Sequence, residues 1–480
     1  MRAVESASSF TLAIGLLAFT MFVIVTTEFV VVGLLPAMAK DLNLSLAEAG
    51  WFVTWFALAA ALLGPPLTML AGRCDSRHVL ITAAIIFAAG NLAIALAPHY
   101  SIVIAIRLLQ GCALPAVASV AVVAAARLAG AEREGWAVSR VNIGVVAATM
   151  LGVPAGVMAA DKAGWPASFA GLALLGLISA GLVAVWFPRM EIAKQPSMLT
   201  EVSLLWRPGF LMHLLLSCIL FAGMFAGYTY IAALLGAVAN LDGAMIGWAL
   251  MGFGLAGAFG NWIVGRVVDR DPLAATAWVT LVLAFAMAVV APAGDSLSSL
   301  LGLVVGLWGA AHMAAFVISQ VRVMRAGREA AAFAISLNIS VCNLGIGLGA
   351  TLGGRITDHY GVGAVGYGGA AAAAAALLIA IAMTVARSRT QATISRGVLG
   401  IAWRRHRSRT KRACCSQTHE NDCERLDHHP SSSPQWERSL AVTLSHLAPC
   451  HTFGRSTLCK CQIRNVRRTL ALEPNEKNLY

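Results

Sequence analysis

Long apolar runs, separated by short polar segments, recur about every 32 residues from the N-terminus to residue 386. Each run is long enough to cross about 30 Å of hydrocarbon as an α-helix that rises 1.5 Å per residue. The pattern therefore predicts an all-α membrane protein with twelve transmembrane helices. We expect these helices at residues 10–35, 49–72, 78–97, 101–127, 137–160, 165–187, 210–237, 243–268, 273–293, 297–324, 330–353 and 362–386.

Polar motifs near the helix ends recur in the two halves of this pattern. The segment Gly72–Arg77 and the segment Gly265–Arg270 each join Gly, Asp and Arg, and their aspartates are 194 residues apart. Asp161 with Gly164, and Asp358 with Gly361, repeat at a distance of 197 residues. Chance matching is the alternative, but the two periods nearly agree. We expect two pseudo-symmetric six-helix bundles, the usual construction of secondary transporters.

Composition excludes the soluble classes. Hydrophobic residues make up 58% of the chain and charged residues 12%, whereas a soluble globular chain carries about 25% charged residues. The net charge of +12 is unevenly placed. Residues 387–480 hold 17 Lys and Arg against 7 Asp and Glu, and residues 1–386 hold 18 against 16. The body is thus almost neutral and the basic charge belongs to the end of the chain.

The placement of Lys and Arg predicts the orientation. With the N-terminus inside, 14 basic residues of the body lie on the inner side and three, Lys40, Lys162 and Arg355, on the outer side. Both termini are then cytoplasmic. We expect an N-terminal six-helix bundle (1–187), a cytoplasmic inter-bundle loop (188–209), a C-terminal six-helix bundle (210–386) and a basic cytoplasmic tail (387–480), largely unstructured.

The tail has a basic run at residues 404–412, just past the last apolar helix. Such a run binds anionic lipid headgroups, and we expect no nucleic-acid partner. Its Cys and His residues lack the paired spacing of a structural zinc site. The alternative is that the tail belongs to no evolved domain, in which case deleting residues 400–480 would leave transport intact.

One acidic residue, Glu28, lies inside an apolar helix, where a charge is costly and is usually paired. Counting along the helices places Glu28, Arg107 and Asn91 at one depth, roughly 10 Å below the outer surface. We expect a Glu28–Arg107 pair with Asn91 and Gln110 nearby. It either carries protons, if a conformational change alters the distance between the two side chains, or is a static ion pair that fixes helix packing.

Two further groups are candidates for movement. In the fifth helix, small residues allow close helix approach and a proline bends the axis, which serves either a conformational seam or simple packing. At the inner loops, charged residues either lock an inner gate across the bundles or are solvated. The seam residues are Gly144, Gly152, Pro154 and Gly156, and the gate residues are Gly72, Asp75, Arg77, Gly265, Arg266, Asp269 and Arg270.

Other polar and aromatic side chains within the helices are weaker candidates. The asparagines either line a cavity or bond between helices, and His213 and His312 are more often packing residues than proton carriers. The aromatic residues either contact a substrate or anchor the helices at the membrane interface. These residues are Asn142, Asn261, Asn338, Asn343, Trp51, Trp55, Phe56, Phe221, Phe225, Tyr228 and Tyr230.

Several of these motifs resemble the major facilitator superfamily, in its twelve-helix drug:proton antiporter branch. Thr27–Phe29 with Gly33–Pro36 is similar to the first-helix motif of the arabinose-efflux, purine-efflux and chloramphenicol-resistance group. Arg107–Gly111 matches the fourth-helix motif, and the helix-five residues resemble the antiporter motif. Gly265–Arg270 is similar to the cytoplasmic-loop motif, of which Gly72–Arg77 is a degenerate copy.

The sequence departs from the family pattern at three places. Neither loop copy continues with the expected Gly-Arg-Lys, because Arg77-His78 and Asp271-Pro272 stand there, and Pro166 replaces the family's arginine after Gly-Trp. These changes concern the gating salt bridges more than the fold.

The resemblance implies a proton-coupled efflux antiporter in the inner membrane of a bacterium, exporting a small organic molecule such as a drug, sugar or purine nucleoside. The alternatives are uptake or facilitated diffusion by the same fold, and a non-transporting membrane sensor. The body has no metal-spaced cluster, nucleophile motif or nucleotide-binding loop, so we expect no enzyme, no cofactor and no ATP-driven pump. Its expected partners are the substrate, protons and the lipid bilayer, and we expect a monomer.

Overall fold

The computed structural model describes residues 2–130, 132–190, 204–268, 270–294 and 298–389. All of them belong to one compact unit, Met1–Ala392. The predicted unstructured tail lies outside the described residues except for its first three positions. The division into two bundles, a loop and a tail at the stated boundaries stays a prediction.

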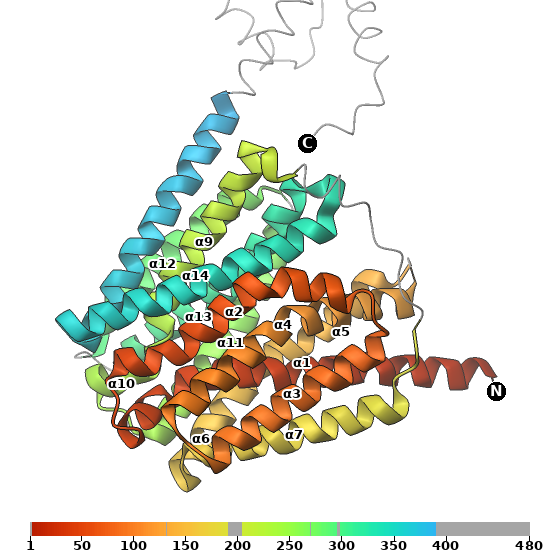
Figure 1. Cartoon of the computed structure of the whole chain (residues 1–480). Coiled ribbons are helices and arrows are strands. Elements are labelled where there is room, and N and C mark those ends of the chain that lie inside the picture. Colours follow the sequence, from red (N-terminus) through yellow and green to blue (C-terminus); the bar gives the residue numbers. More distant parts are fainter. Residues whose placement is uncertain (1, 131, 191–203, 269, 295–297, 390–480) are drawn as a thin grey trace, which may run out of the picture. The chain divides into compact units, whose positions relative to one another are not determined.

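Within the described residues, twelve helices are long and apolar enough to cross a membrane, and they confirm the predicted all-α fold (Figure 1). Their large exposed apolar side chains, such as Leu62, Leu96 and Leu303, suit a lipid environment. In chain order the helices are α1 (Arg2–Asp41), α2 (Leu46–Ala71), α3 (Ser76–Leu96), α4 (Tyr100–Ala129), α5 (Glu134–Ala147) continued by η1 (Ala148–Gly152) and α6 (Val153–Ala163), α7 (Trp165–Trp186), α9 (Pro208–Tyr228) followed by the short α10 (Ile231–Ala239), α11 (Gly243–Val267), α12 (Pro272–Gly294), α13 (Ser298–Ala326), α14 (Ala331–Tyr360) and a last span, Val362–Arg389.

Side chains and glycines define the helix ends. At the start of α2, Ser45 and Glu48 form a reciprocal capping box, in which each backbone N–H donates to the other side chain. Helices α6 and α14 both end at a glycine with positive φ, 80° at Gly164 and 82° at Gly361. Only glycine adopts this conformation without strain. Because these two glycines are the pair found 197 residues apart, their shared geometry supports the internal repeat.

Several predicted helix boundaries were wrong. The first helix begins at Arg2 and not at residue 10, and the helix predicted at 330–353 continues to Tyr360. The first helix does not end at Leu35 but continues through Pro36 to Asp41. The predicted helix 210–237 is broken after Tyr228, and α10 begins at Ile231. The break brings Tyr230 against α14, where its hydroxyl donates to the Ala350 carbonyl at 2.9 Å. An apolar run carries no signal for such a tertiary contact.

The helices of each half pack together, α2 on α4 and α3 on α7 in the first, α9 on α14 and α11 on α13 in the second. Across the halves, α14 lies along α2, and α11 lies against η1 and α6 (Figure 1). The loops gather at two ends. We call the end with the loops after α1, α3, α6 and α10 the Asp41 end, and the end with the loops after α2, α4, α7 and α11 the Arg73 end.

Candidate transport site

A buried hydrogen-bond network surrounds Arg107, which is 0% exposed. Its guanidinium donates to three backbone carbonyls: Nε to Phe52 at 3.1 Å, Nη1 to Thr27 at 3.0 Å and Nη2 to Glu28 at 3.0 Å. It also lies 4.1 Å from the ring centre of Phe56. Hydrogen bonds from a charged donor contribute about 1.5–3 kcal/mol each, so this arginine clamps α4 onto α1 and α2.

Asn91 and Gln110 extend the network, as expected from their depth. The Gln110 amide donates to the Asn91 side-chain oxygen at 3.0 Å, and the Asn91 amide donates to the Thr27 hydroxyl at 2.9 Å. The Thr27 hydroxyl in turn donates to the Val23 carbonyl at 3.0 Å. The chain of donors joins α4, α3 and α1 in one direction, which fixes the orientation of both amides.

Glu28 lies beside this network but differs from the predicted ion pair. Arg107 contacts its backbone oxygen, and the ion pairs within 4.0 Å in the described part of the chain do not include the Glu28 carboxylate. Thr27 on the same turn is 0% exposed, whereas Glu28 is only half-buried. The guanidinium is therefore held in place by carbonyls, and the carboxylate stays available for another partner.

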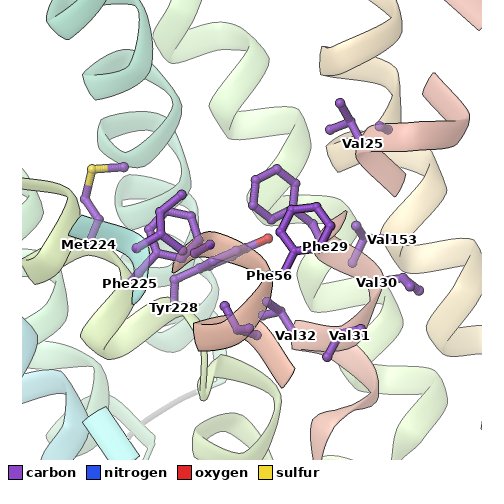
Figure 2. Packing of buried hydrophobic residues seen from close by; sticks show 14 of the residues in the cluster. Val25, Phe29, Val30, Val31, Val32, Phe56, Val153, Met224, Phe225 and Tyr228 are labelled. Carbon is purple, nitrogen blue, oxygen red and sulfur yellow. The ribbon is translucent and has the colours of Figure 1, made fainter. Parts of the chain in front are cut away.

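An aromatic cluster joins the two halves next to Glu28 (Figure 2). The Phe29 ring of α1 lies 6.0 Å from Phe225 and 6.5 Å from Tyr228, both on α9. The ring of His312 on α13 packs against the same two rings at a tilt, with its centre 5.3 Å from that of Phe225 and 4.5 Å from that of Tyr228. His312 is 1% exposed, and neither of its ring nitrogens has a hydrogen-bond partner among the described residues.

Three members of this cluster, Phe253, Trp308 and Phe316, were not among the candidates predicted from the sequence. Phe253 lies 5.5 Å from His312, and Phe316 lies 5.8 Å from it. Trp308, His312 and Phe316 follow each other at intervals of four, so they share one face of α13. This spacing is the sequence pattern from which these cluster members could have been predicted. By contrast, Trp51 and Trp55 are 37% and 38% exposed and lie outside the cluster.

The helix-five residues lie between the halves. A Cβ on Gly144, Gly152 or Gly156 would come within 2.0–2.5 Å of atoms of α1, so these glycines allow α1 to pack closely. Pro154 lacks the N–H that would bond back to Met150, and the helix widens into the π-turn η1, where the Val153 N–H reaches the Ala148 carbonyl.

The close contacts between the halves lie at the Asp41 end and the middle of the spans. A Cβ on Gly50 would be 2.0 Å from the Tyr230 hydroxyl, and one on Gly254 would be 2.6 Å from the Met150 Cα. Thr54 and Thr351 are 3.4 Å apart through their hydroxyl oxygens. Nearer the Arg73 end, a Cβ on Gly15, Gly135, Gly209 or Gly265 would meet nothing within 4 Å.

Comparison with known proteins identifies the family. A family model described as the Major Facilitator Superfamily matches residues 17–350. The chain is 32% identical to the inner membrane transport protein YdhP of Escherichia coli (strain K12), over 71% of this chain and 87% of that protein. The chain belongs to the Major Facilitator Superfamily. It is a secondary transporter that crosses the inner membrane several times, and it is not an enzyme.

Other known proteins match a similar share of this chain. The chain is 29% identical to the uncharacterized MFS-type transporter YtbD of Bacillus subtilis (strain 168), over 72% of this chain and 88% of that protein. Its fold is similar to a mutant of the nucleoside transporter NupG, with a TM-score of 0.64 and 15% identity over 78% and 99% of the two chains. A bacterial homolog of the human lysosomal transporter Spinster, inward-facing and unoccupied, gives 0.59 and 14% over 79% and 95%.

In this superfamily member the first predicted gate segment bonds within its own half. Gly72 ends α2, where its N–H donates to the Thr68 carbonyl. Asp75 begins α3, where its carboxylate accepts from the Arg77 N–H at 3.1 Å and from the Met190 N–H at 3.3 Å. The Arg77 guanidinium donates to the Ala184 carbonyl at the end of α7. These contacts tie α3 to α7.

The second gate segment is less engaged. Arg266 stacks on Trp262, one turn earlier on α11, at 3.4 Å, and Arg270 is exposed. Asp269 lies outside the described residues. Within the described part of the chain, no ion pair joins the two segments. At the family departures, Asp271 caps α12 through the N–H groups of Leu273 and Ala274, and Pro166 occupies the first turn of α7, where its missing N–H costs little.

Proposed function

We propose that this protein is a proton-coupled efflux antiporter of the drug:proton branch, with Glu28 as its proton-carrying group. The observation that carries the proposal is the half-buried carboxylate beside a guanidinium that three carbonyls hold in place. Because the guanidinium is bound to main-chain carbonyls, including that of Glu28 itself, a rotation of the Glu28 side chain changes the distance between the two charges and with it the proton affinity of the carboxylate.

The aromatic cluster supports a substrate site next to this group. Phe29 directly follows Glu28 and contacts Phe225 and Tyr228 of the other half. A small organic molecule that separates these rings would act on α1 and on α9 together. The unpartnered ring nitrogens of His312 would hydrogen-bond a polar group on that molecule. Substrate and proton would thus act on the same turn of α1.

The contacts between the halves support an inward-facing state. Gly50 against Tyr230 and Thr54 against Thr351 hold the Asp41 end closed. With both termini cytoplasmic, the Arg73 end faces the cytoplasm. The gate residues Asp75, Arg77, Arg266 and Arg270 would then engage across the halves only in the opposite, outward-facing state, whereas in the present state Asp75 and Arg77 bond within the first half.

The test uses the purified full chain in acid-loaded vesicles, oriented so that the Arg73 end faces the medium. A panel of amphenicols, purine nucleosides and sugars is added, and proton release and substrate movement are recorded together. We expect one class to release protons from wild-type vesicles. Glu28→Gln should lose proton release and keep substrate-for-substrate exchange. Glu132→Gln, an exposed acid, is the matched control and should behave as wild type.

Three outcomes contradict the proposal. Proton release that persists in Glu28→Gln removes Glu28 as the proton carrier. Substrate movement without proton movement in wild type identifies facilitated diffusion. No movement of any compound, in vesicles whose protein is folded, favours a sensor.

A further inference from the structure

The second half contains a buried cation that the proposed proton pathway does not use. Arg322 of α13 is 2% exposed. Its Nη1 donates to the His213 carbonyl at 2.7 Å and to the His213 Nδ1 at 3.1 Å, and its Nη2 donates to the Ser217 hydroxyl at 2.8 Å. All of these acceptors are uncharged groups on α9. The buried Nε has no hydrogen-bond partner among the described residues.

The partners fix the state of the histidine. A guanidinium only donates hydrogen bonds, so the His213 Nδ1 must accept. A neutral His213 therefore carries its proton on Nε2, the ring nitrogen that does not contact Arg322. Ser319 of α13 and Cys342 of α14 complete the surroundings, since Cys342 interacts with both Ser319 and Arg322. Among the described residues, the site combines polar side chains of three helices and no acidic group.

No acid of the described second half neutralises this cation. Asp242 caps α11 through the Met245 N–H, and Asp271 caps α12 and pairs with Arg387 at 3.7 Å. Glu329 pairs with Arg207, and Asp358 lies near the end of α14 at the Asp41 end. Arg107 in the first half differs in this respect, because Glu28 lies beside it.

A buried charge is normally paired, and arginine does not escape by losing its proton. We propose that Arg322 binds an anionic group: a small inorganic anion, or the carboxylate of a small organic molecule, held by the free Nε and the donors around it. The site lies near the Arg73 end, because Arg322 is four residues from the end of α13 and His213 is five residues after the start of α9.

The first test measures the melting temperature of the purified full chain in detergent. The sodium salts of chloride, inorganic phosphate and acetate are titrated at constant ionic strength against 2-(N-morpholino)ethanesulfonate, a bulky sulfonate that is neither an inorganic anion nor a carboxylate. We expect at least one anion to raise the melting temperature of wild type with saturation, as binding to a single site requires. Saturation with acetate alone indicates an organic carboxylate, and saturation with chloride or phosphate indicates an inorganic anion.

Variants tie the response to the side chain. Arg322→Gln should lose the saturable rise, and Arg322→Lys should keep a weaker one, because lysine is a point charge without the planar fork. Arg207→Gln is the matched control; it removes an exposed arginine near the same end and should respond as wild type. A wild-type chain that responds to no anion, or an Arg322→Gln variant that responds like wild type, overturns the proposal.

A second measurement needs no variant, in case Arg322→Gln fails to fold. Thiol alkylation is followed in the wild-type chain by peptide mass spectrometry, with the same anions present. Occupancy should slow alkylation of buried Cys342 by the factor 1 + [L]/Kd, about tenfold at ten times Kd. Exposed Cys74 serves as the internal control and should react at an unchanged rate. Equal effects on both thiols mean a general salt effect, and no effect on either thiol means that no anion binds. Both outcomes contradict a site.

Discussion

The contact between Gly50 and Tyr230 gives the sharpest test of how the two halves are held together. Gly50 of α2 belongs to the first half and Tyr230 to the second. A Cβ on Gly50 would lie 2.0 Å from the Tyr230 hydroxyl oxygen and 2.9 Å from its Cζ. We predict that Gly50→Ala forces the halves apart at the Asp41 end and shifts the protein toward an open Asp41 end.

The phenol has nowhere to move. It is 0% exposed, its hydroxyl donates to the Ala350 carbonyl at 2.9 Å, and α14 packs closely on it, since a Cβ built on Gly353 or Gly354 would also lie within 3 Å of its atoms. Overpacking of this kind costs about 1–3 kcal/mol. Since about 1.4 kcal/mol is a factor of ten, the ratio of molecules with a closed Asp41 end to molecules with an open one should decrease by roughly 5-fold to 150-fold.

Hydrogen–deuterium exchange of the purified full chain measures this shift. Backbone amides at 46–58 and 347–360, which face each other at the Asp41 end, should exchange faster in Gly50→Ala. Gly252→Ala is the control, because a Cβ there meets nothing within 4 Å and the substitution only favours the helix. Adding Tyr230→Phe to Gly50→Ala removes the clashing oxygen and should restore part of the protection. If Gly50→Ala exchanges no faster than Gly252→Ala, this contact does not hold the end closed.

Two further predictions concern other charged groups. Arg107→Lys should lose most transport while the chain still folds, because one ammonium group cannot reach all three carbonyls through which Arg107 joins α4 to α1 and α2. Transport in vesicles and elution as a single folded species check this. Full transport by the lysine variant would contradict it. The hydrogen bond and charge of Arg207 hold the pKa of Glu329 below its ordinary value of 4.5. This pair therefore stabilises the folded state above that value, and the contribution is lost as the pH falls through the lowered pKa. Glu329→Gln should lower the melting temperature slightly at neutral pH, since both groups are exposed, and the two profiles should converge in acid, so that the acid limb of the variant is slightly flatter. An equal difference between the two profiles at every pH would count against this role.

Hydropathy predicted the twelve spans because membrane insertion selects length and apolarity, which are local properties of sequence. It also predicted the depth of Glu28, Arg107 and Asn91, since depth follows from counting residues along a helix. The acceptors of Arg107 were not predictable in this way. Backbone carbonyls look alike at every position, so the sequence favoured the carboxylate of Glu28, whereas the guanidinium reaches the carbonyl of the same residue.

Contacts between distant helices were the other unpredictable part. At the break before α10, the Tyr230 hydroxyl donates a hydrogen bond to the carbonyl of Ala350, which is 120 residues away in the sequence. The aromatic cluster likewise requires α9 and α11 to pack against His312 of α13. A histidine in an apolar helix has the same local pattern whether its nitrogens are bonded or free, so only the fold distinguishes the two.

One turn of α1 connects the parts of the proposed mechanism. Thr27 and Glu28 offer the carbonyls that hold Arg107, Glu28 bears the carboxylate, and Phe29 touches α9 of the other half. On the opposite side, Gly152 and Gly156 leave α1 in close contact with helix five. A motion of the second half that displaces Phe29 would tilt this turn relative to α2, whose Phe52 carbonyl also holds the guanidinium. If α1 moves with α2 and α4 as one rigid body, the distance from Glu28 to Arg107 stays constant and coupling requires a rotation of the carboxylate alone. Two structures, with the Asp41 end closed and open, would distinguish these cases by the Glu28 Cα to Arg107 Cζ distance.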